Sequence, residues 1–269
     1  MRYTAAVADT KWTAPATTPP TWVDIAGYAF EKIHSNVLVR ALNGGKPEAR
    51  KLAAKMWARA SGETIDVDAV CATTEYRLGR GRHSVVDFLV DMTSGGKRHR
   101  LGVEVKVDGA PNAIQFKAME AKLSGEHERL VLLAFGAAQV CNYEHSGREL
   151  CAQKLWNVRD IIEMSELIEG ASPCPDVARG WLAELQNEDR RRLSPFTNDL
   201  LGWGGRVRAK RAYQYAQVAK AIRGVDGVRT RISIQPFGVV MTLVARPIKS
   251  VTVYLEFVNG VVAVKAGAN

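Results

Sequence analysis

Features that would place the chain in a familiar class are largely absent from its sequence. No apolar run approaches the roughly 18 to 20 residues that span a membrane, and the first residues, MRYTAA, lack the apolar core of a signal peptide. The four cysteines show no Cys-x-x-Cys spacing and no paired histidines, so neither a zinc site nor a disulfide framework is indicated. We expect a cytoplasmic protein with reduced, mostly buried thiols and no membrane partner.

Composition sets wide limits on the architecture. The 269 residues are 46% hydrophobic and 24% charged, which is ordinary for a globular protein, and the length allows one large domain or two smaller ones. The sequence shows no coiled-coil or other dimer signal, so a homodimer stays open without being indicated.

The positive charge is concentrated in the C-terminal third. Residues 176–269 hold fifteen Lys and Arg against seven Asp and Glu, whereas residues 1–175 hold 22 against 21. A basic segment attracts polyanions, of which nucleic acid is the commonest, although a merely solvated surface explains the charge about as well.

The spacing of apolar residues predicts two successive kinds of structure in the first 170 residues. Residues 1–20 are rich in Thr and Pro and predict a flexible leader. Helical spacing follows, then period-two alternation with short Gly-containing turns, which predicts an antiparallel meander. The expected elements are helices over 22–42 and 47–60, strands over 67–78, 83–92 and 98–107, a helix over 113–123, a strand over 129–135 and a helix over 149–168.

A second region begins after the Pro-containing break at 171–175. It holds expected helices over 177–192 and 206–223 and strands over 228–235, 237–245, 250–258 and 261–265. We therefore expect an α/β domain over 21–170 and a smaller, basic α+β module with an antiparallel sheet over 176–269.

One cluster of charged residues lies where a strand normally carries apolar ones. In the strand LGVEVKV, Glu104 and Lys106 share one face, and the preceding strand carries Asp87. An Asp/Glu-x-Lys triplet is expected by chance about once or twice in such a chain. Two further matches, at 9–11 and 120–122, lie in the leader and on an expected helix, so only 104–106 has the strand context.

This element order and these residues resemble the PD-(D/E)XK nuclease superfamily, the restriction-endonuclease-like fold, over residues 22–135. The resemblance implies that Asp87 and Glu104 are the acidic metal ligands and Lys106 the motif lysine. It also matches Gln115, nine residues after Lys106, to the glutamine of several branches, and Glu31 to the first-helix glutamate that often completes the acidic cluster. No proline precedes Asp87, as is true of many members.

The chemistry can be argued from the residue types. Hydrolysis of a phosphodiester needs an activated water and neutralisation of charge on the phosphate, and Mg²⁺ held by hard oxygen ligands supplies both. We assign Asp87 and Glu104 as ligands with the Val105 carbonyl as a third, and expect Mn²⁺ as a substitute. Lys106 would orient or deprotonate the water and offset charge, and Gln115 would position Lys106 or the water.

Basic residues outside the motif are candidates for phosphate contact. A basic helix with aromatic residues can follow a nucleic acid backbone, although it can also be an amphipathic helix packed on the following sheet. The candidates are Arg80, Arg82, Arg206, Arg208, Lys210 and Arg211.

Each assignment has a plainer alternative. Asp87, Glu104 and Lys106 can be a solvated salt bridge, Asp91 shares the parity of Asp87, and Glu75 can join the acidic cluster. The expected function is a Mg²⁺-dependent nuclease acting on nucleic acid, with DNA favoured because most relatives act on DNA. The alternatives are a non-catalytic nucleic-acid-binding or assembly protein on the same fold and an RNA-directed nuclease.

Overall fold

The computed structural model describes most of the chain. The described residues are 31–80, 84–109, 113–141, 144–145, 148–196, 207–223, 225, 227–244, 251–258 and 261–268. The expected leader over 1–20, the start of the first expected helix, Arg82 and Arg206 lie outside these residues.

The first region is built on a mixed five-stranded sheet. Its order is β1-β2-β3-β4-β7, in which β1, β2 and β3 are antiparallel and β4 and β7 run parallel to β3. The strands are β1 (Ala69–Arg77), β2 (Val85–Ser94), β3 (Lys97–Lys106), β4 (Glu128–Ala134) and β7 (Leu155–Trp156). The expected meander is confirmed, as is the strand expected after the helix, which the structure places parallel to β3.

The β2–β3 hairpin shows why the meander forms. Gly95 and Gly96 have φ values of 55° and 77°, and Ser94 pairs with Lys97 across the two-residue turn. A turn with both central residues at positive φ matches the twist of paired strands, and glycine adopts this conformation at little cost.

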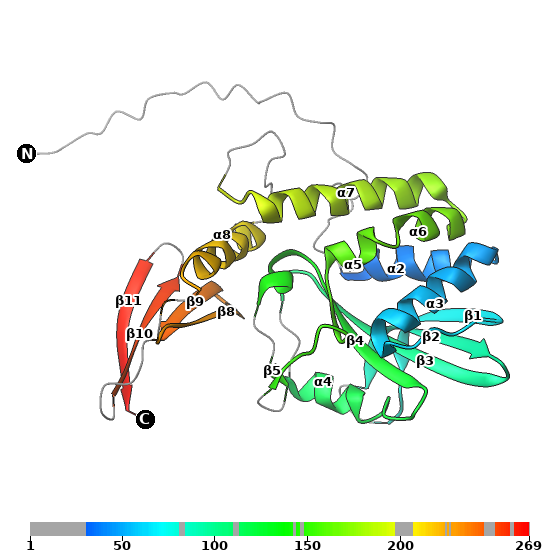
Figure 1. The fold of residues 1–269 in the computed structure, drawn as a ribbon, viewed down its shortest axis with the longest axis horizontal. Coiled ribbons are helices and arrows are strands. Elements are labelled where there is room, and N and C mark those ends of the chain that lie inside the picture. The colour runs from blue at the N-terminus through cyan, green and yellow to red at the C-terminus, as the bar shows by residue number, and fades with distance from the viewer. Residues whose placement is uncertain are drawn as a thin grey trace, which may run out of the picture.

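Helices cover both faces of the sheet (Figure 1). One apolar cluster joins one face to α2, α3, α5, α6 and α7, and a second joins the other face to α4 and the C-terminal region. The helices of the first group are α2 (Glu31–Leu42), α3 (Pro47–Ser61), α5 (Val158–Ile162), α6 (Ser165–Ala171) and α7 (Pro175–Leu193), and α4 spans Ala113–Glu120.

The single helix expected over 149–168 is wrong. That stretch holds the short strand β7 and then α5 and α6, after a two-stranded ribbon of β5 (Glu144–His145) and β6 (Arg148–Glu149). Asn157 and Asp160 form a capping box at the start of α5, because the Asn157 side chain accepts from Arg159 N and Asp160 accepts from Asn157 N. This cap starts a new helix inside the stretch and leaves Trp156 buried on a sheet strand.

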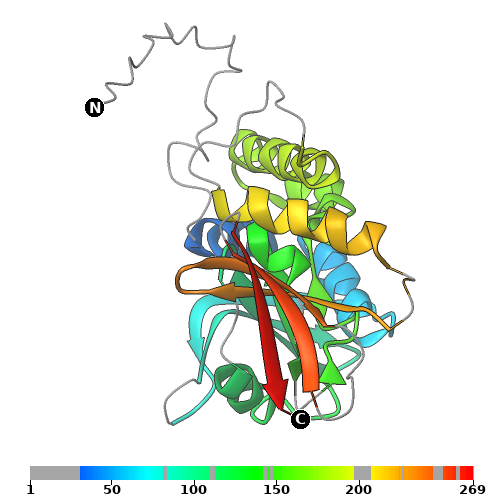
Figure 2. The ribbon, with the colours of Figure 1, turned by 90° about the vertical axis from the view of Figure 1, so that its left-hand side faces the viewer.

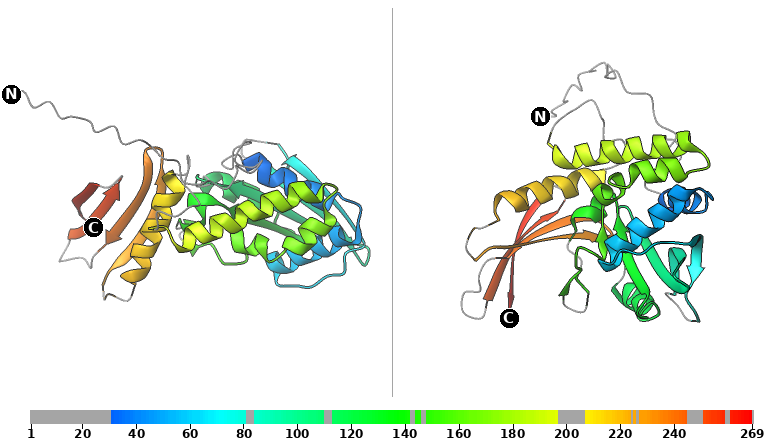
Figure 3. Two further views of the ribbon diagram at one scale, coloured as in Figure 1. Left: turned by 90° about the horizontal axis from the view of Figure 1, so that it is seen from above. Right: turned by 45° about the vertical axis from the view of Figure 1, so that its right-hand side comes forward.

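The C-terminal region forms a four-stranded antiparallel sheet with one helix. The order is β11-β10-β9-β8, and the elements are α8 (Val207–Ala221), β8 (Arg229–Gln235), β9 (Gly238–Val244), β10 (Val251–Val258) and β11 (Val261–Ala268). The expected helix-plus-sheet arrangement is confirmed. Figures 2 and 3 show α8 beside this sheet on the side that faces the first region, and a 3-10 turn, η1 (Gly136–Val140), contacts α8 from that region.

α7 packs on the first region, although it follows the break in sequence at 171–175. Trp181, Leu182 and Leu185 belong to the same buried cluster as α2 and α3. No helix in the described part of the chain has the length and hydrophobicity needed to cross a membrane.

Candidate active site

Three carboxylates converge on one ammonium group at the end of β3. The Lys106 Nζ lies 2.9 Å from Glu104 Oε1, 3.1 Å from Glu31 Oε2 and 4.0 Å from Asp87 Oδ2. These four residues come from β2, β3 and α2, so segments far apart in the sequence supply them. Because the carboxylates of Asp87 and Glu104 both lie within 4.0 Å of the same Nζ atom, they are close together on the same side of the sheet.

The strands separate locally at this point. The β2–β3 ladder ends at the pair Phe88–Val103, and beyond it the Asp87 carboxylate accepts a 2.7 Å hydrogen bond from Val105 N. On the other side of β2, Glu75 in β1 has a positive φ of 49°. Glu75 lies opposite Asp87 between the pairs Thr74–Phe88 and Tyr76–Val86.

Glu104 is a buried carboxyl, only 2% exposed. Burial and the neighbouring Asp87 carboxylate raise the pKa of Glu104 to about 7, although Lys106 partly offsets both effects. Gln115 on α4 donates a 3.3 Å hydrogen bond from Nε2 to Glu104 Oε1. A buried carboxyl that titrates near neutral pH is typical of functional sites.

Lys106 is held as a charged ammonium. Burial alone would lower the pKa of Lys106, but the attraction of Glu104, Glu31 and Asp87 outweighs burial and raises it. Nζ also donates a 2.8 Å hydrogen bond to the Val105 carbonyl. A firmly protonated lysine is suited to offset negative charge rather than to take a proton from water.

The oxygens around Lys106 are the donor types that Mg²⁺ prefers. Asp87, Glu104 and the Val105 carbonyl are hard oxygen donors. When Glu104 is ionised, three carboxylates surround one ammonium group. A divalent cation would relieve the crowding that raises the pKa of Glu104. Within the described ranges, no three His, Cys, Asp or Glu side chains are placed so that they could hold a metal ion. Lys106 Nζ contacts Glu104 Oε1 and the Val105 carbonyl oxygen. Ion binding here therefore requires that Lys106 move away from these two oxygens.

The position of Glu31 depends on buried aromatic contacts one turn along α2. His34 is fully buried, stacks on Phe135 at a ring distance of 4.1 Å and accepts a 3.1 Å hydrogen bond from Trp181 Nε1 to its Nδ1. Phe135 N in turn donates to the Lys106 carbonyl at 2.7 Å. The sequence alone gives no signal for this support, because the partners of His34 lie about 100 and 150 residues away in the sequence.

The two alternative acidic residues have other partners. Asp91 accepts from Arg98 Nε at 2.8 Å and lies 3.6 Å from Arg100 Nε, away from the Lys106 group. Glu75 forms a 2.8 Å ion pair with Lys32. Neither contacts Lys106 among the described interactions.

The predicted phosphate-contacting residues are spread over two regions. Arg80 is exposed, and its carbonyl accepts a 2.8 Å hydrogen bond from Lys122 Nζ. Arg208 on α8 is exposed and donates to the Pro236 carbonyl at 3.1 Å. Lys210 and Arg211 on α8 are half-buried.

Comparison with models of protein families, with curated proteins and with solved structures found no match for this chain. The site must therefore be interpreted from its own geometry.

Proposed function

We propose that the chain is a metal-dependent nuclease that hydrolyses phosphodiester bonds in DNA, on a restriction-endonuclease-like core and in the cytoplasm. The observation that carries the proposal is the convergence of Asp87, Glu104 and Glu31 on Lys106. An exposed ion pair would not need a carboxyl that is 2% exposed and has a raised pKa. The Lys106 ammonium has three acidic neighbours, supplied by three different elements.

Each residue of the site has a separate role in the proposed reaction. Asp87, Glu104 and the Val105 carbonyl would hold Mg²⁺, which supplies an activated water and stabilises charge on the phosphate. The Lys106 ammonium would place a positive charge next to the same oxygens. Gln115 orients the Glu104 carboxyl, and Glu31 holds Lys106 from the side of α2.

Basic groups near the site and in the C-terminal module support a polyanionic substrate. Arg80 precedes β2, and α8 carries Arg208, Lys210 and Arg211. The net positive charge of residues 176–269 would raise the local concentration of nucleic acid.

The test is a cleavage assay with purified protein on plasmid, linear duplex, single-stranded DNA and RNA, each with Mg²⁺, Mn²⁺ or EDTA. We expect DNA cleavage that needs the metal and is lost in Asp87→Asn. Asp91→Asn is a matched control, because the same change is made on the same strand at a carboxylate that pairs with Arg98. Cleavage of RNA alone would replace the substrate, and binding without cleavage of any of these substrates would contradict the nuclease proposal.

A further inference from the structure

The basic helix α8 packs against η1, a segment that lies close to the candidate active site. η1 follows β4 and is bound to the end of β3, because Phe135 N donates to the Lys106 carbonyl at 2.7 Å and Ala138 N donates to the Val107 carbonyl at 3.0 Å. α8 in turn packs on η1. η1 therefore connects α8 to the end of β3, the strand that carries Lys106.

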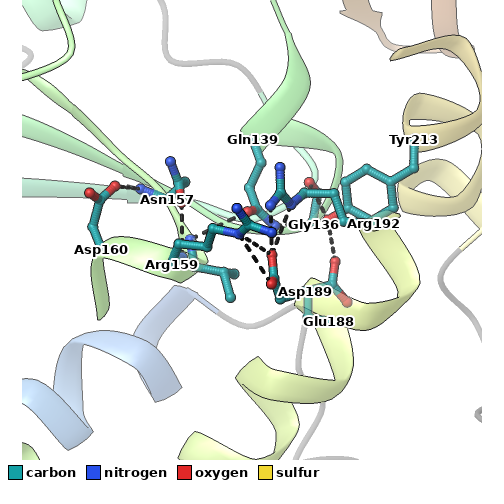
Figure 4. Close-up of polar contacts among 10 residues, drawn as sticks. Gly136, Gln139, Asn157, Arg159, Asp160, Glu188, Asp189, Arg192 and Tyr213 are labelled. Atoms are coloured by element: carbon teal, nitrogen blue, oxygen red, sulfur yellow. Dashed lines mark hydrogen bonds and ion pairs between the residues drawn. The ribbon is translucent and has the colours of Figure 1, made fainter. Parts of the chain in front are cut away.

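Tyr213 makes the polar contact between α8 and η1 (Figure 4), beside an apolar cluster that includes Ala137, Ala138 and Ala212. Its hydroxyl donates to the Gly136 carbonyl at 2.9 Å and accepts from Gln139 Nε2 at 2.8 Å. Oε1 of Glu188 on α7 is a second acceptor for the same hydroxyl proton, so the Gly136 carbonyl and the Glu188 carboxylate share it. Tyr213 and Glu188 are fully buried, so the contacts of the hydroxyl with Gly136 and Glu188 lie inside the protein.

The end of α7 extends this polar joint to a further helix. Asp189 accepts from Arg159 on α5 at 3.1 Å and from Arg192 at 2.6 Å, as Figure 4 shows. α7 also holds α2 through the hydrogen bond from Trp181 to His34. α7 thus contacts both α2, which carries Glu31, and α8, which carries the basic residues.

Burying polar and charged groups between helices costs free energy, because these groups lose their contacts with water. Glu184 and Glu188 are both buried beside Arg191, with Nη1 at 2.7 Å from Glu184 and 3.7 Å from Glu188. Apolar packing would hold two elements together without the cost of removing charges from water. A directional network instead fixes the orientation of its members, which is the property needed to align two parts of one binding surface.

We propose that Tyr213 is a positioning residue that aligns α8 with the carboxylate site, so that one nucleic acid backbone is held by both. Arg211 and Lys210 lie within one turn of Tyr213 on α8, so a rotation of the helix would move them directly. The inference rests on the proposed function for its substrate, but it concerns binding and does not need cleavage.

The test measures binding of fluorescently labelled duplexes in EDTA, where no metal-dependent cleavage occurs. A duplex of about 30 base pairs, roughly 100 Å long, offers enough backbone to engage both surfaces at once, whereas a duplex of about 6 base pairs, roughly 20 Å long, offers far fewer phosphates. The variant is Tyr213→Phe, which removes only the hydroxyl. The matched control is Tyr215→Phe on the same helix, because the buried Tyr215 hydroxyl has no hydrogen-bond partner among the residues that the structure describes.

We expect Tyr213→Phe to bind the long duplex about tenfold more weakly, with a salt dependence reduced by the one or two phosphate contacts that are lost. Binding of the short duplex should stay as in the wild type, and Tyr215→Phe should match the wild type on both. Arg211→Glu should weaken binding of the long duplex in the wild type, and less so in the Tyr213→Phe background.

Two results would overturn the inference. One is wild-type affinity and salt dependence of Tyr213→Phe on the long duplex, and the other is an equal loss on both duplexes, which indicates general damage to the fold. Circular dichroism checks folding, and if Tyr213→Phe does not fold, Gln139→Met replaces it, because Gln139 is half-buried and donates to the same hydroxyl. If the wild type binds as expected but never cleaves, the nuclease proposal fails and the positioning role stands.

Discussion

Replacement of Glu104 by Gln should stabilise the metal-free protein at alkaline pH. The pKa of the Glu104 carboxyl rises from 4.5 to about 7, with burial as the largest cause and Asp87 as the second. A raised pKa means that the folded protein favours the protonated form. Gln is a neutral side chain of the same shape, so it keeps the favourable state at every pH.

The magnitude follows from the shift. One pKa unit corresponds to about 1.4 kcal/mol, so ionisation of Glu104 costs the wild type about 3 kcal/mol of unfolding free energy. The wild type has its full unfolding free energy below pH 4.5. As the pH rises from 4.5 toward 7 it loses about 3 kcal/mol of that free energy, and the unfolding free energy stays at this lower value at higher pH. The advantage of Glu104→Gln should therefore be near zero at pH 4.5 and reach about 3 kcal/mol by pH 8.

Urea unfolding in EDTA between pH 4.5 and 8.5 measures this difference. Mg²⁺ should stabilise the wild type but not Glu104→Gln, because the ion needs the carboxylate. Asp91→Asn is the control and should show no comparable gain, since Asp91 is paired with arginines outside the Lys106 group. A Glu104→Gln variant that is less stable than the wild type at pH 8, or a difference that does not change with pH, would refute the reasoning.

Three further changes test other parts of the structure. Lys106→Met should abolish cleavage but bind Mn²⁺ several-fold more tightly, because the ammonium no longer contacts Glu104; isothermal titration showing weaker binding would contradict this. Gly136→Ala should lower the unfolding free energy by about 2 kcal/mol or more, since Gly136 has φ 54° and a Cβ would lie 2.9 Å from the Val107 carbonyl oxygen; an unchanged urea midpoint would exclude this. Asn157→Ala should cost about 1 kcal/mol through loss of the α5 cap, as thermal unfolding can show, and no change would mean that the cap is dispensable.

Local patterns predicted most of the secondary structure. Period-two alternation located β1 to β3 and β8 to β11, and it placed Glu104 and Lys106 on one face of β3. A short apolar run located β4. The expectation failed over 149–168, where helical spacing outweighed the signal Asn157-x-x-Asp160, a cap that was visible in the sequence. A search for caps within long apolar stretches would have divided that helix correctly.

Contacts between distant segments could not be predicted in the same way. Tyr213 meets Gly136 and Glu188 across separations of 77 and 25 residues, and no periodicity records such a meeting. The support of α2 by His34 and Trp181 is likewise tertiary. The residue types of the site were therefore predictable, whereas the elements that hold them and the link to α8 required the fold.

The most direct test of the central claim is Mn²⁺ binding followed by electron paramagnetic resonance. We predict one ion per chain in the wild type, strongly weakened binding in Asp87→Asn and in Glu104→Gln, and wild-type binding in Asp91→Asn. Absence of binding in the wild type, or equal binding in all four proteins, would contradict the claim that these carboxylates form a divalent-cation site.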